Sequence, residues 1–413
     1  MPSDKPRLWT PDFIVLLLIS LLAFIGCQAL NNGTPIYVKD YEGSTGFSGV
    51  LILEFSLCAG FARIVVGRVI DRGMRRRPLI MGAVFMLAGT AGALVLPGIA
   101  PQVALRAVQG IGFGCVTTAS STAAADVLPA RRLGEGIGYF GLGQSLGMAI
   151  GPTLGVVLTS MLYRESLFLG VSAVLTVLMV LVFAVRYESH PQKLPETSAY
   201  RVRYERSLRE QPASAPKGQR GLISSLFVRT AWAGALPHLV NTFAIGIATS
   251  YVALYGTQLG YGNPGIFFML GAITMTLVRL LGGRFIDSIK PIRLFAVPCV
   301  CGVVFYLMLA FGASEWSFYA AGLFFGLSMG ISFPLLNSVC VKCTASERWG
   351  AASAQFLLMN DLGVGVGALI WGVAIDAAGF VPVMVGGAVT AALTFVAALV
   401  MFPRNLEADG LRE

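Results

Sequence analysis

Residues 63–71 read RIVVGRVID, and residues 279–287 read RLLGGRFID. Five positions of these two stretches are identical, and the offset between them is 216 residues. The same offset aligns two further glycine pairs, Gly147 with Gly363 and Gly151 with Gly367. A single offset that relates separate segments of the chain indicates two parallel repeats of one unit.

Long apolar stretches fill most of both repeats. The 413 residues are 55% hydrophobic and only 12% charged, and the mean hydropathy is +0.74. A soluble chain carries about 25% charged residues, whereas apolar stretches of about 20 residues are typical of helices that span a bilayer. We therefore predict an all-α membrane protein of twelve transmembrane helices in two pseudo-symmetric six-helix bundles. The predicted spans are 13–38, 46–69, 78–97, 101–125, 134–159, 166–187, 228–256, 263–283, 291–312, 316–341, 349–373 and 380–402.

The distribution of positive charge predicts the orientation of the chain. An even number of spans places both termini on one side. Of the 30 lysines and arginines, all but five lie in or beside the loops of that side, and only Lys39 and Arg164 lie in the opposite loops. Because lysine and arginine collect on the cytoplasmic side, we predict a multi-pass protein of a bacterial inner membrane with cytoplasmic termini. The net charge of +9 thus reflects topology and not a nucleic-acid partner.

The midpoint of the chain separates the two repeats. Residues 188–223 are rich in proline, serine and charge, a composition typical of a linker. We predict a first six-helix bundle at residues 1–187, a cytoplasmic linker at 188–227, a second bundle at 228–402 and a cytoplasmic tail at 403–413.

A basic loop follows the second span. Residues 67–77 read GRVIDRGMRRR and resemble the loop signature of the major facilitator superfamily, G-x-x-x-D-R-x-G-R-[RK]. The second copy, GGRFIDSIKPIR at 282–293, is weaker because Ser288 replaces the arginine. The resemblance covers the whole chain and implies a transporter, usually a monomer, whose two halves rock around a central path.

The residues of this loop predict a conformational latch. Glycine lets a facing helix approach closely, and Asp71, four residues after Gly67, lies on the same helical face. By analogy with the family, the Asp71 carboxylate binds the positive N-terminal end of the span near Trp349 and stabilises the outward-open state. A turn flanked by topology-setting charges would explain the arginines alone. The predicted latch residues are Gly67, Asp71, Arg72, Gly73, Arg75 and Arg76, with Gly283 and Asp287 in the second copy.

Span 134–159 contains a regular stripe of small residues. Its segment GLGQSLGMAIGPTLG, residues 141–155, resembles the antiporter signature G-x-x-x-G-P-x-x-G of proton-coupled exporters in the family. The stripe, which could hinge or seal the two halves, consists of Gly147, Gly151, Pro152 and Gly155. Glycines four apart form one smooth face, and a proline bends a helix. The alternative is an ordinary packing face.

Three ionisable residues within the spans are candidates for proton coupling. Arg106 lies in LRAVQGIGFG, which resembles a third signature of the family, and Glu54 lies at a similar depth. Protonation of Glu54 would release Arg106 if the two pair; the alternatives are a static pair or an arginine that snorkels outward. Asp361 could carry a proton or bind a cationic substrate, and its alternative is a hydrogen bond to a neighbouring backbone group or to Asn360.

Polar residues of the first, fourth, seventh and tenth spans are candidates for the substrate cavity, because these spans line the central path in the family. The candidates are Gln28, Asn31, Asn32, His238, Asn241, Tyr251, Ser332 and Asn337. The alternative is that most of them tie helices together.

Taken together, these features predict proton-coupled efflux, by antiport, of a small amphipathic or cationic molecule through alternating access. The alternative is a major facilitator importer or uniporter of a sugar, organic acid or metabolite. We predict no cofactor, since the proton gradient supplies the energy and no nucleotide-binding fingerprint occurs. An enzyme is not expected, because the chain holds two histidines and no nucleophile–base pair. Cys340 and Cys343 form a lone C-x-x-C, which is too little for a metal site.

Overall fold

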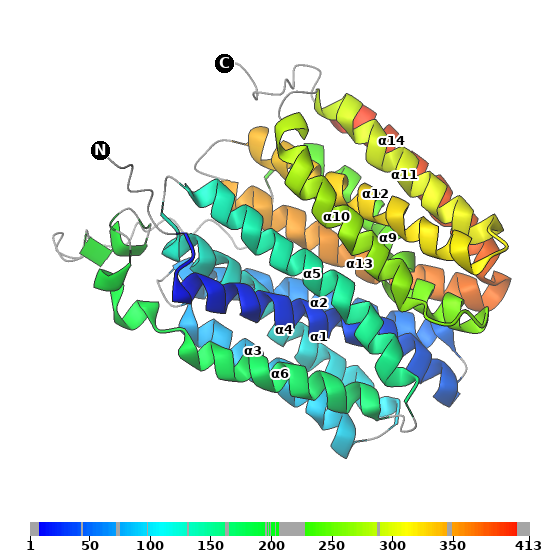
Figure 1. Cartoon of the computed structure of the whole chain (residues 1–413), viewed down its shortest axis with the longest axis horizontal. Coiled ribbons are helices and arrows are strands. Elements are labelled where there is room, and N and C mark those ends of the chain that lie inside the picture. Colours follow the sequence, from blue (N-terminus) through cyan, green and yellow to red (C-terminus); the bar gives the residue numbers. More distant parts are fainter. Residues whose placement is uncertain are drawn as a thin grey trace.

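The structure is a computed structural model of the chain. It describes residues 8–42, 44–71, 75–96, 98–129, 132–161, 165–194, 196, 198, 200–202, 204–205, 228–286, 290–344 and 349–402. Long helices account for most of this part of the chain (Figure 1). They are α1 (Pro11–Glu42), α2 (Thr45–Asp71), α3 (Arg76–Val95), α4 (Ala100–Val127), α5 (Leu133–Thr159), α6 (Ser166–Ala184), α9 (Trp232–Gln258), α10 (Gly265–Ile286), α11 (Pro291–Phe311), α12 (Glu315–Lys342), α13 (Trp349–Ala378) and α14 (Phe380–Met401).

These helices confirm the twelve predicted spans, whose ends differ from the helix ends by at most five residues. Ten of the helices are long and apolar enough to cross a membrane, and an eleventh, α10, contains a shorter apolar stretch. The exception is α4, which carries Gln102, Arg106 and Gln109 in its first half. All three side chains are buried, so α4 turns its polar residues toward other helices and away from lipid. The chain is a multi-pass membrane protein.

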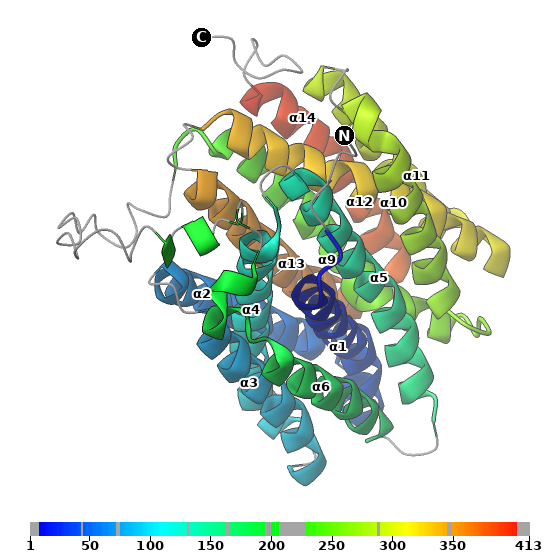
Figure 2. The same cartoon turned by 60° about the vertical axis from the view of Figure 1, so that its left-hand side comes forward.

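The helices form two six-helix bundles with matching contacts. In the first bundle α1 packs on α5, α2 on α4, and α3 on α6, and the second repeats these contacts as α9 on α13, α10 on α12, and α11 on α14. Figures 1 and 2 show the blue-to-green first bundle beside the green-to-red second bundle. One apolar core fills the first bundle, and separate cores lie in the second. The bounds of the predicted domains remain a prediction.

Two long helix pairs join the bundles. Helix α2 packs along α13, and its repeat equivalent α10 packs along α5. We use "terminal side" for the side at which α1 begins and α14 ends. At the opposite side, the Asp376 carboxylate accepts hydrogen bonds from the backbone nitrogens of Thr45 (3.0 Å) and Gly46 (2.6 Å). On the same side Thr153 Oγ1 donates to the Gly265 carbonyl oxygen at 3.0 Å. Both helix pairs are therefore closed at the side opposite the termini.

The described contacts of two glycines on α2 differ between its two ends. A Cβ atom added at Gly49 would lie 2.6 Å from the Ala368 carbonyl oxygen, so the backbones touch there. At Gly67, no atom of the described residues would lie within 4 Å of an added Cβ atom. The protein is thus in a conformation that is closed at the Asp376 end of α2 and α13 and loosely packed at Gly67.

The beginning of the predicted linker packs on the first bundle. Two short 3₁₀ helices, η2 (Tyr187–Ser189) and η3 (Pro191–Lys193), follow α6. Tyr187, Leu194 and Ser198 are buried, and Ser198 forms an isolated antiparallel bridge with Pro129 at the end of α4. Leu194 and Ser198, which belong to the predicted 188–227 linker, are therefore attached to the first bundle, while residues 206–227 lie outside the described residues.

Candidate functional site

An ion pair joins the two bundles at mid-depth. Arg63 Nε on α2 lies 2.8 Å from Asp361 Oδ2 on α13, and the side chains are only 13% and 11% exposed. Arg63 Nη1 also donates to Thr117 Oγ1 at 2.8 Å, and its guanidinium lies 5.6 Å from the centre of the Phe113 ring. Asn360, the alternative partner of Asp361 in the sequence analysis, donates from Nδ2 to Asp361 Oδ1 at 3.3 Å. Asp361 therefore has both partners, and the stronger one comes from the other bundle.

Arg63 is a residue whose role the sequence analysis missed. The residue was visible as one of three arginines within the predicted spans, and it begins the repeated stretch 63–71. A charge inside a bilayer normally has a partner, so this position was a detectable candidate. The identity of the partner was not detectable, because Asp361 is distant in the sequence and belongs to the other repeat.

The second interface contains the equivalent positions, with a serine where the first has an acid. The 216-residue offset carries Arg63 onto Arg279 and Ser145 onto Asp361. In the structure Arg279 on α10 reaches α5, where Nη1 donates to the Gly141 carbonyl oxygen at 3.0 Å and also to Ser145 Oγ. At both interfaces, an arginine of one helix therefore faces the repeat-equivalent position of the partner helix. One interface is ionic, and the other joins a cation to neutral oxygens.

Arg106 is 1% exposed and bonded to neutral groups. Its Nη2 donates to Asn31 Oδ1 at 3.2 Å and to the Leu30 carbonyl oxygen at 3.3 Å, and its Nη1 donates to Gln109 Oε1 at 3.2 Å. The pairing of Arg106 with Glu54 is not found in this conformation. Glu54 Oε2 is instead buried without a hydrogen-bond partner among the described residues. Oxygen atoms of α1 and α4 accept from Nη1 and Nη2 of Arg106, while Nε is buried without a hydrogen-bond partner among the described residues.

The cavity candidates of the first bundle form a polar cluster beside Arg106. Asn31 Nδ2 donates to Gln28 Oε1 at 3.4 Å, and Asn32 Nδ2 donates to the Gln28 carbonyl oxygen at 3.0 Å. Gln28 also lines a small cavity between the bundles, together with Met148, Thr249, Phe268, Gly271, Ala272, Met275, Phe325, Gly326 and Met329. Gln28 is therefore the predicted cavity residue that the structure places at the junction of both bundles.

Several candidates of the second bundle hold helices together. Asn241 Nδ2 donates to Ser332 Oγ at 3.3 Å, which links α9 with α12. Tyr251 donates its hydroxyl to the Ala368 carbonyl oxygen at 2.6 Å, which links α9 with α13. The His238 ring stacks on Phe356 with 3.8 Å between ring centres. Asn337 Oδ1 is buried without a partner among the described residues.

The glycine stripe of α5 packs against α1 within the first bundle. A Cβ atom would lie 2.6 Å from Phe24 Cβ at Gly147 and 2.6 Å from Gln28 Cβ at Gly151. At Gly155 a Cβ atom would lie 2.4 Å from the Ala29 carbonyl oxygen. Pro152 lies inside the helix. The stripe therefore sets the approach of α1 to α5, which matches the packing alternative, and its glycines do not face the second bundle.

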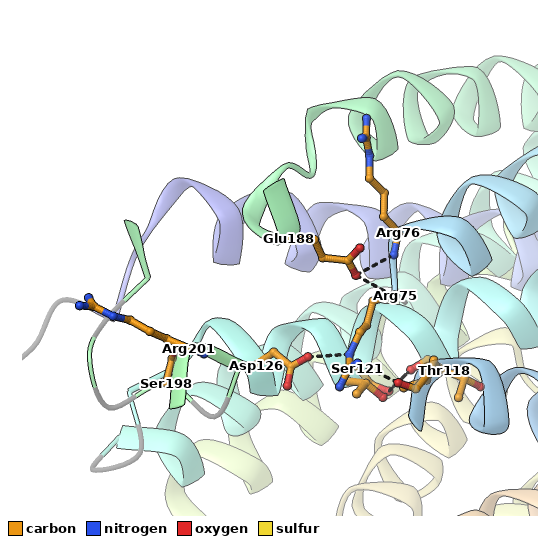
Figure 3. Close-up of polar contacts among 10 residues, drawn as sticks. Arg75, Arg76, Thr118, Ser121, Asp126, Glu188, Ser198 and Arg201 are labelled. Carbon is orange, nitrogen blue, oxygen red and sulfur yellow. Dashed lines mark hydrogen bonds and ion pairs between the residues drawn. The ribbon is translucent and has the colours of Figure 1, made fainter. Parts of the chain in front are cut away.

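The predicted latch loop is attached to the first bundle (Figure 3). Arg75 Nε lies 2.7 Å from Asp126 Oδ2 at the end of α4, with side chains only 2% and 4% exposed. Glu188 Oε1 accepts hydrogen bonds from the backbone nitrogens of Arg75 (2.6 Å) and Arg76 (3.0 Å), at the start of α3. Asp126 and Glu188 were not among the sequence candidates. The remaining latch positions, namely the side chain of Asp71, Arg72, Gly73, the surroundings of Gly283, and Asp287, lie outside the described residues.

Comparison with known proteins agrees with this architecture. A sequence profile of the Major Facilitator Superfamily matches residues 16–368. The chain is 20% identical to the Staphylopine export protein of Staphylococcus aureus, over 89% of this chain and 90% of that protein. It is 24% identical to the Multidrug resistance protein MdtG of Dickeya zeae, over 81% of this chain and 79% of that protein.

A solved structure has the same fold. The crystal structure of a mutant of the nucleoside transporter NupG superposes with a TM-score of 0.72 and 12% identity, covering 95% of this chain and all of that chain. Within the described residues, no three histidine, cysteine, aspartate or glutamate side chains gather as metal ligands. The profile match, the two six-helix bundles and the repeated interface lead to one assignment: the chain is a transporter of the Major Facilitator Superfamily.

Proposed function

We propose that the protein exports a small amphipathic molecule in exchange for protons. The observation that carries this proposal is the Arg63–Asp361 ion pair, because it crosses the interface between the bundles at mid-depth. A proton on Asp361 removes the negative charge, and among the described residues Arg63 then keeps Thr117 as a hydrogen-bond partner. Breaking a buried ion pair by removing the charge of one partner is strongly destabilising. Here it destabilises the contact between α2 and α13. Protonation therefore favours separation of α2 from α13.

The transport cycle follows from the two closed helix pairs. We propose that the bundles, at residues 1–187 and 228–402, tilt about these pairs as a monomer, with the intervening linker and the C-terminal tail in the cytoplasm. The positive charge of the terminal-side loops supports a cytoplasmic location for the termini. The conformation described above then has its loosely packed end toward the cytoplasm. In this cycle a proton binds Asp361 from outside in the outward-open state and leaves toward the cytoplasm in the conformation described here, where the Arg63–Asp361 pair forms again. The proton gradient would supply the energy without a cofactor.

Two observations support export over import. The two proteins compared above are named for export of staphylopine and for multidrug resistance. In addition, residues 147–155 resemble the antiporter signature of the family. An importer or uniporter of a sugar, organic acid or metabolite remains the second candidate, and the direction of the coupled proton movement distinguishes the two.

Everted membrane vesicles test the coupling directly. Cells with and without the protein would first be screened with a panel of small aromatic compounds, and compounds that accumulate less in the presence of the protein would be radiolabelled. We expect vesicles to take up such a compound when their interior is acidic and to release it when nigericin collapses the gradient. Uptake driven by the opposite gradient would overturn export by antiport.

A further inference from the structure

The two bundle interfaces differ by one charge. Arg63 is neutralised by Asp361, whereas Arg279, its repeat equivalent, faces Ser145. Among the described residues, no carboxylate lies within ion-pair distance of Arg279. Glu54 and Asp361, the described carboxylates deep within the spans, belong to α2 and α13, the helices of the other interface. Among the described residues, Arg279 is therefore a cation without a counter-charge in its own surroundings.

The bonds that Arg279 makes do not complete its coordination. The Gly141 carbonyl and the Ser145 hydroxyl accept from Nη1, while Nε is buried without a hydrogen-bond partner among the described residues. A guanidinium within a membrane is costly without a partner. Its planar fork matches an oxyanion that accepts two parallel hydrogen bonds. The free Nε edge of Arg279 is a donor group of this kind.

Arg279 lies next to the cavity between the bundles. Met275, one helical turn before Arg279 on α10, and Met148, three residues after Ser145 on α5, both line that cavity. Residues three or four apart are neighbours on one helix face. The remaining lining includes Phe268, Phe325 and Met329, so the cavity is mainly apolar. In this conformation the cavity measures only about 10 Å³, so a cargo that presents one end to Arg279 requires the cavity to widen.

We propose that the cargo carries a carboxylate that binds Arg279 at the α5–α10 interface and supplies the negative charge that Asp361 supplies to Arg63. This inference rests on the proposed transport function and specifies its cargo as an amphipathic anion, in place of the cationic molecule considered from the sequence. Each interface then responds to its own ligand. A proton weakens the ionic contact between α2 and α13, and the anion of the cargo strengthens the contact between α5 and α10.

Three probes of one shape test the charge requirement. They are 1-naphthoate, 1-naphthamide and 1-naphthylmethylammonium, which carry a negative, no and a positive charge. Each would be titrated against the purified protein in detergent, and binding would be measured from the shift in the thermal unfolding midpoint. We expect naphthoate to bind at least about tenfold more tightly than the other two, as is typical when a charged hydrogen bond is gained.

Two substitutions at Ser145 separate charge from structure. Ser145→Asp leaves Arg279 in place but gives it an internal counter-ion, so we expect it to weaken naphthoate binding about tenfold or more. Ser145→Asn is the matched neutral control and should retain the preference for naphthoate. Arg279→Gln should remove that preference, and Arg279→Lys should retain part of it. Binding would be compared only among variants whose unfolding midpoint without any probe equals that of the wild-type protein. This requirement controls for misfolding.

The results distinguish this inference from the proposed function. If wild-type protein binds the three probes equally, or if naphthoate binding is unchanged in folded Ser145→Asp protein, the Arg279 site is wrong. Proton-driven transport of 1-naphthylmethylammonium by the Ser145→Asp protein would then still support the export function. Conversely, naphthoate binding that requires Arg279, without any transport driven by a pH gradient, supports the site and overturns the export function.

Discussion

Arg75 and Asp126 form an ion pair in which Nε and Oδ2 lie 2.7 Å apart, almost fully buried at the terminal side of the first bundle. Arg75 also donates from Nη1 to the Ile70 carbonyl oxygen at 2.7 Å. The pair thus connects the end of α2, the start of α3 and the end of α4. Its members are separated in sequence by a complete helix hairpin, so the contact stabilises the folded bundle and not a local turn.

Asp126→Asn should destabilise the protein by about 3–5 kcal/mol, the cost typical of breaking a buried ion pair on one side. The measurement is the free energy of unfolding of the purified protein in mixed detergent. The matched control is Glu205→Gln, which removes the exposed ion pair between Arg201 and Glu205 and should cost less than about 1 kcal/mol. Equal effects of the two substitutions would show that burial of the Arg75–Asp126 pair contributes nothing.

Asp361→Asn should uncouple transport from protons, since asparagine keeps the shape of the side chain but binds no proton. We expect gradient-driven uptake into everted vesicles to fall at least about tenfold, as for loss of a charged hydrogen bond. Exchange of labelled for unlabelled cargo without a gradient should persist. Asp361→Glu is the control, and it should retain part of the coupling. Full gradient-driven uptake by the asparagine variant would exclude Asp361 as the proton carrier.

Asp376→Asn should loosen the closed end of the interface. The carboxylate accepts from two backbone nitrogens at the start of α2, and loss of such a helix cap costs about 1 kcal/mol. We expect the amides of Thr45 and Gly46 to exchange with deuterium about fivefold faster, which is the population change that corresponds to this energy. Peptides from the core of α6 serve as the internal reference. Unchanged protection at residues 45 and 46 would contradict the capping role.

Two glycine substitutions should separate packing from conformational change. Gly155→Ala places a methyl group against the Ala29 carbonyl oxygen, so we expect it to destabilise the first bundle by about 1–3 kcal/mol. Gly67→Ala contacts none of the described residues in this conformation and should leave the unfolding midpoint unchanged. If Gly67 belongs to a latch that closes in the other conformation, the same variant should still transport more slowly. Normal stability together with normal transport in Gly67→Ala would rule out the latch.

The fold was largely predictable from the sequence because its signals are local. Apolar stretches, the repeat and the distribution of charge each require only neighbouring residues or one constant offset. The helix ends are less accurate where the chain emerges from the apolar stretch, as at residues 373–378, where α13 continues past the predicted end. Asp376, which lies in that extension, was therefore missed.

The site was less predictable because its contacts cross the repeat. Depth along a helix suggested Glu54 as the partner of Arg106, but depth does not fix the direction in which a side chain points. Arg106 turns to Asn31 of α1, and Asp361 meets Arg63 of α2. The alignment of Asp361 with Ser145 was visible in the sequence. Only the structure shows what this alignment means, because it places Arg63 opposite Asp361 and Arg279 opposite Ser145.

The burial of Gln102, Arg106 and Gln109 has a consequence for biogenesis. A helix with an arginine inside its span gains little or nothing by entering lipid alone. Helix α4 finds its hydrogen-bond partners on α1 and packs on α2 and α3. Helix α4 therefore has to leave the translocon together with helices that were synthesised before it. In a nascent chain that lacked α1, α4 would be poorly retained in the bilayer.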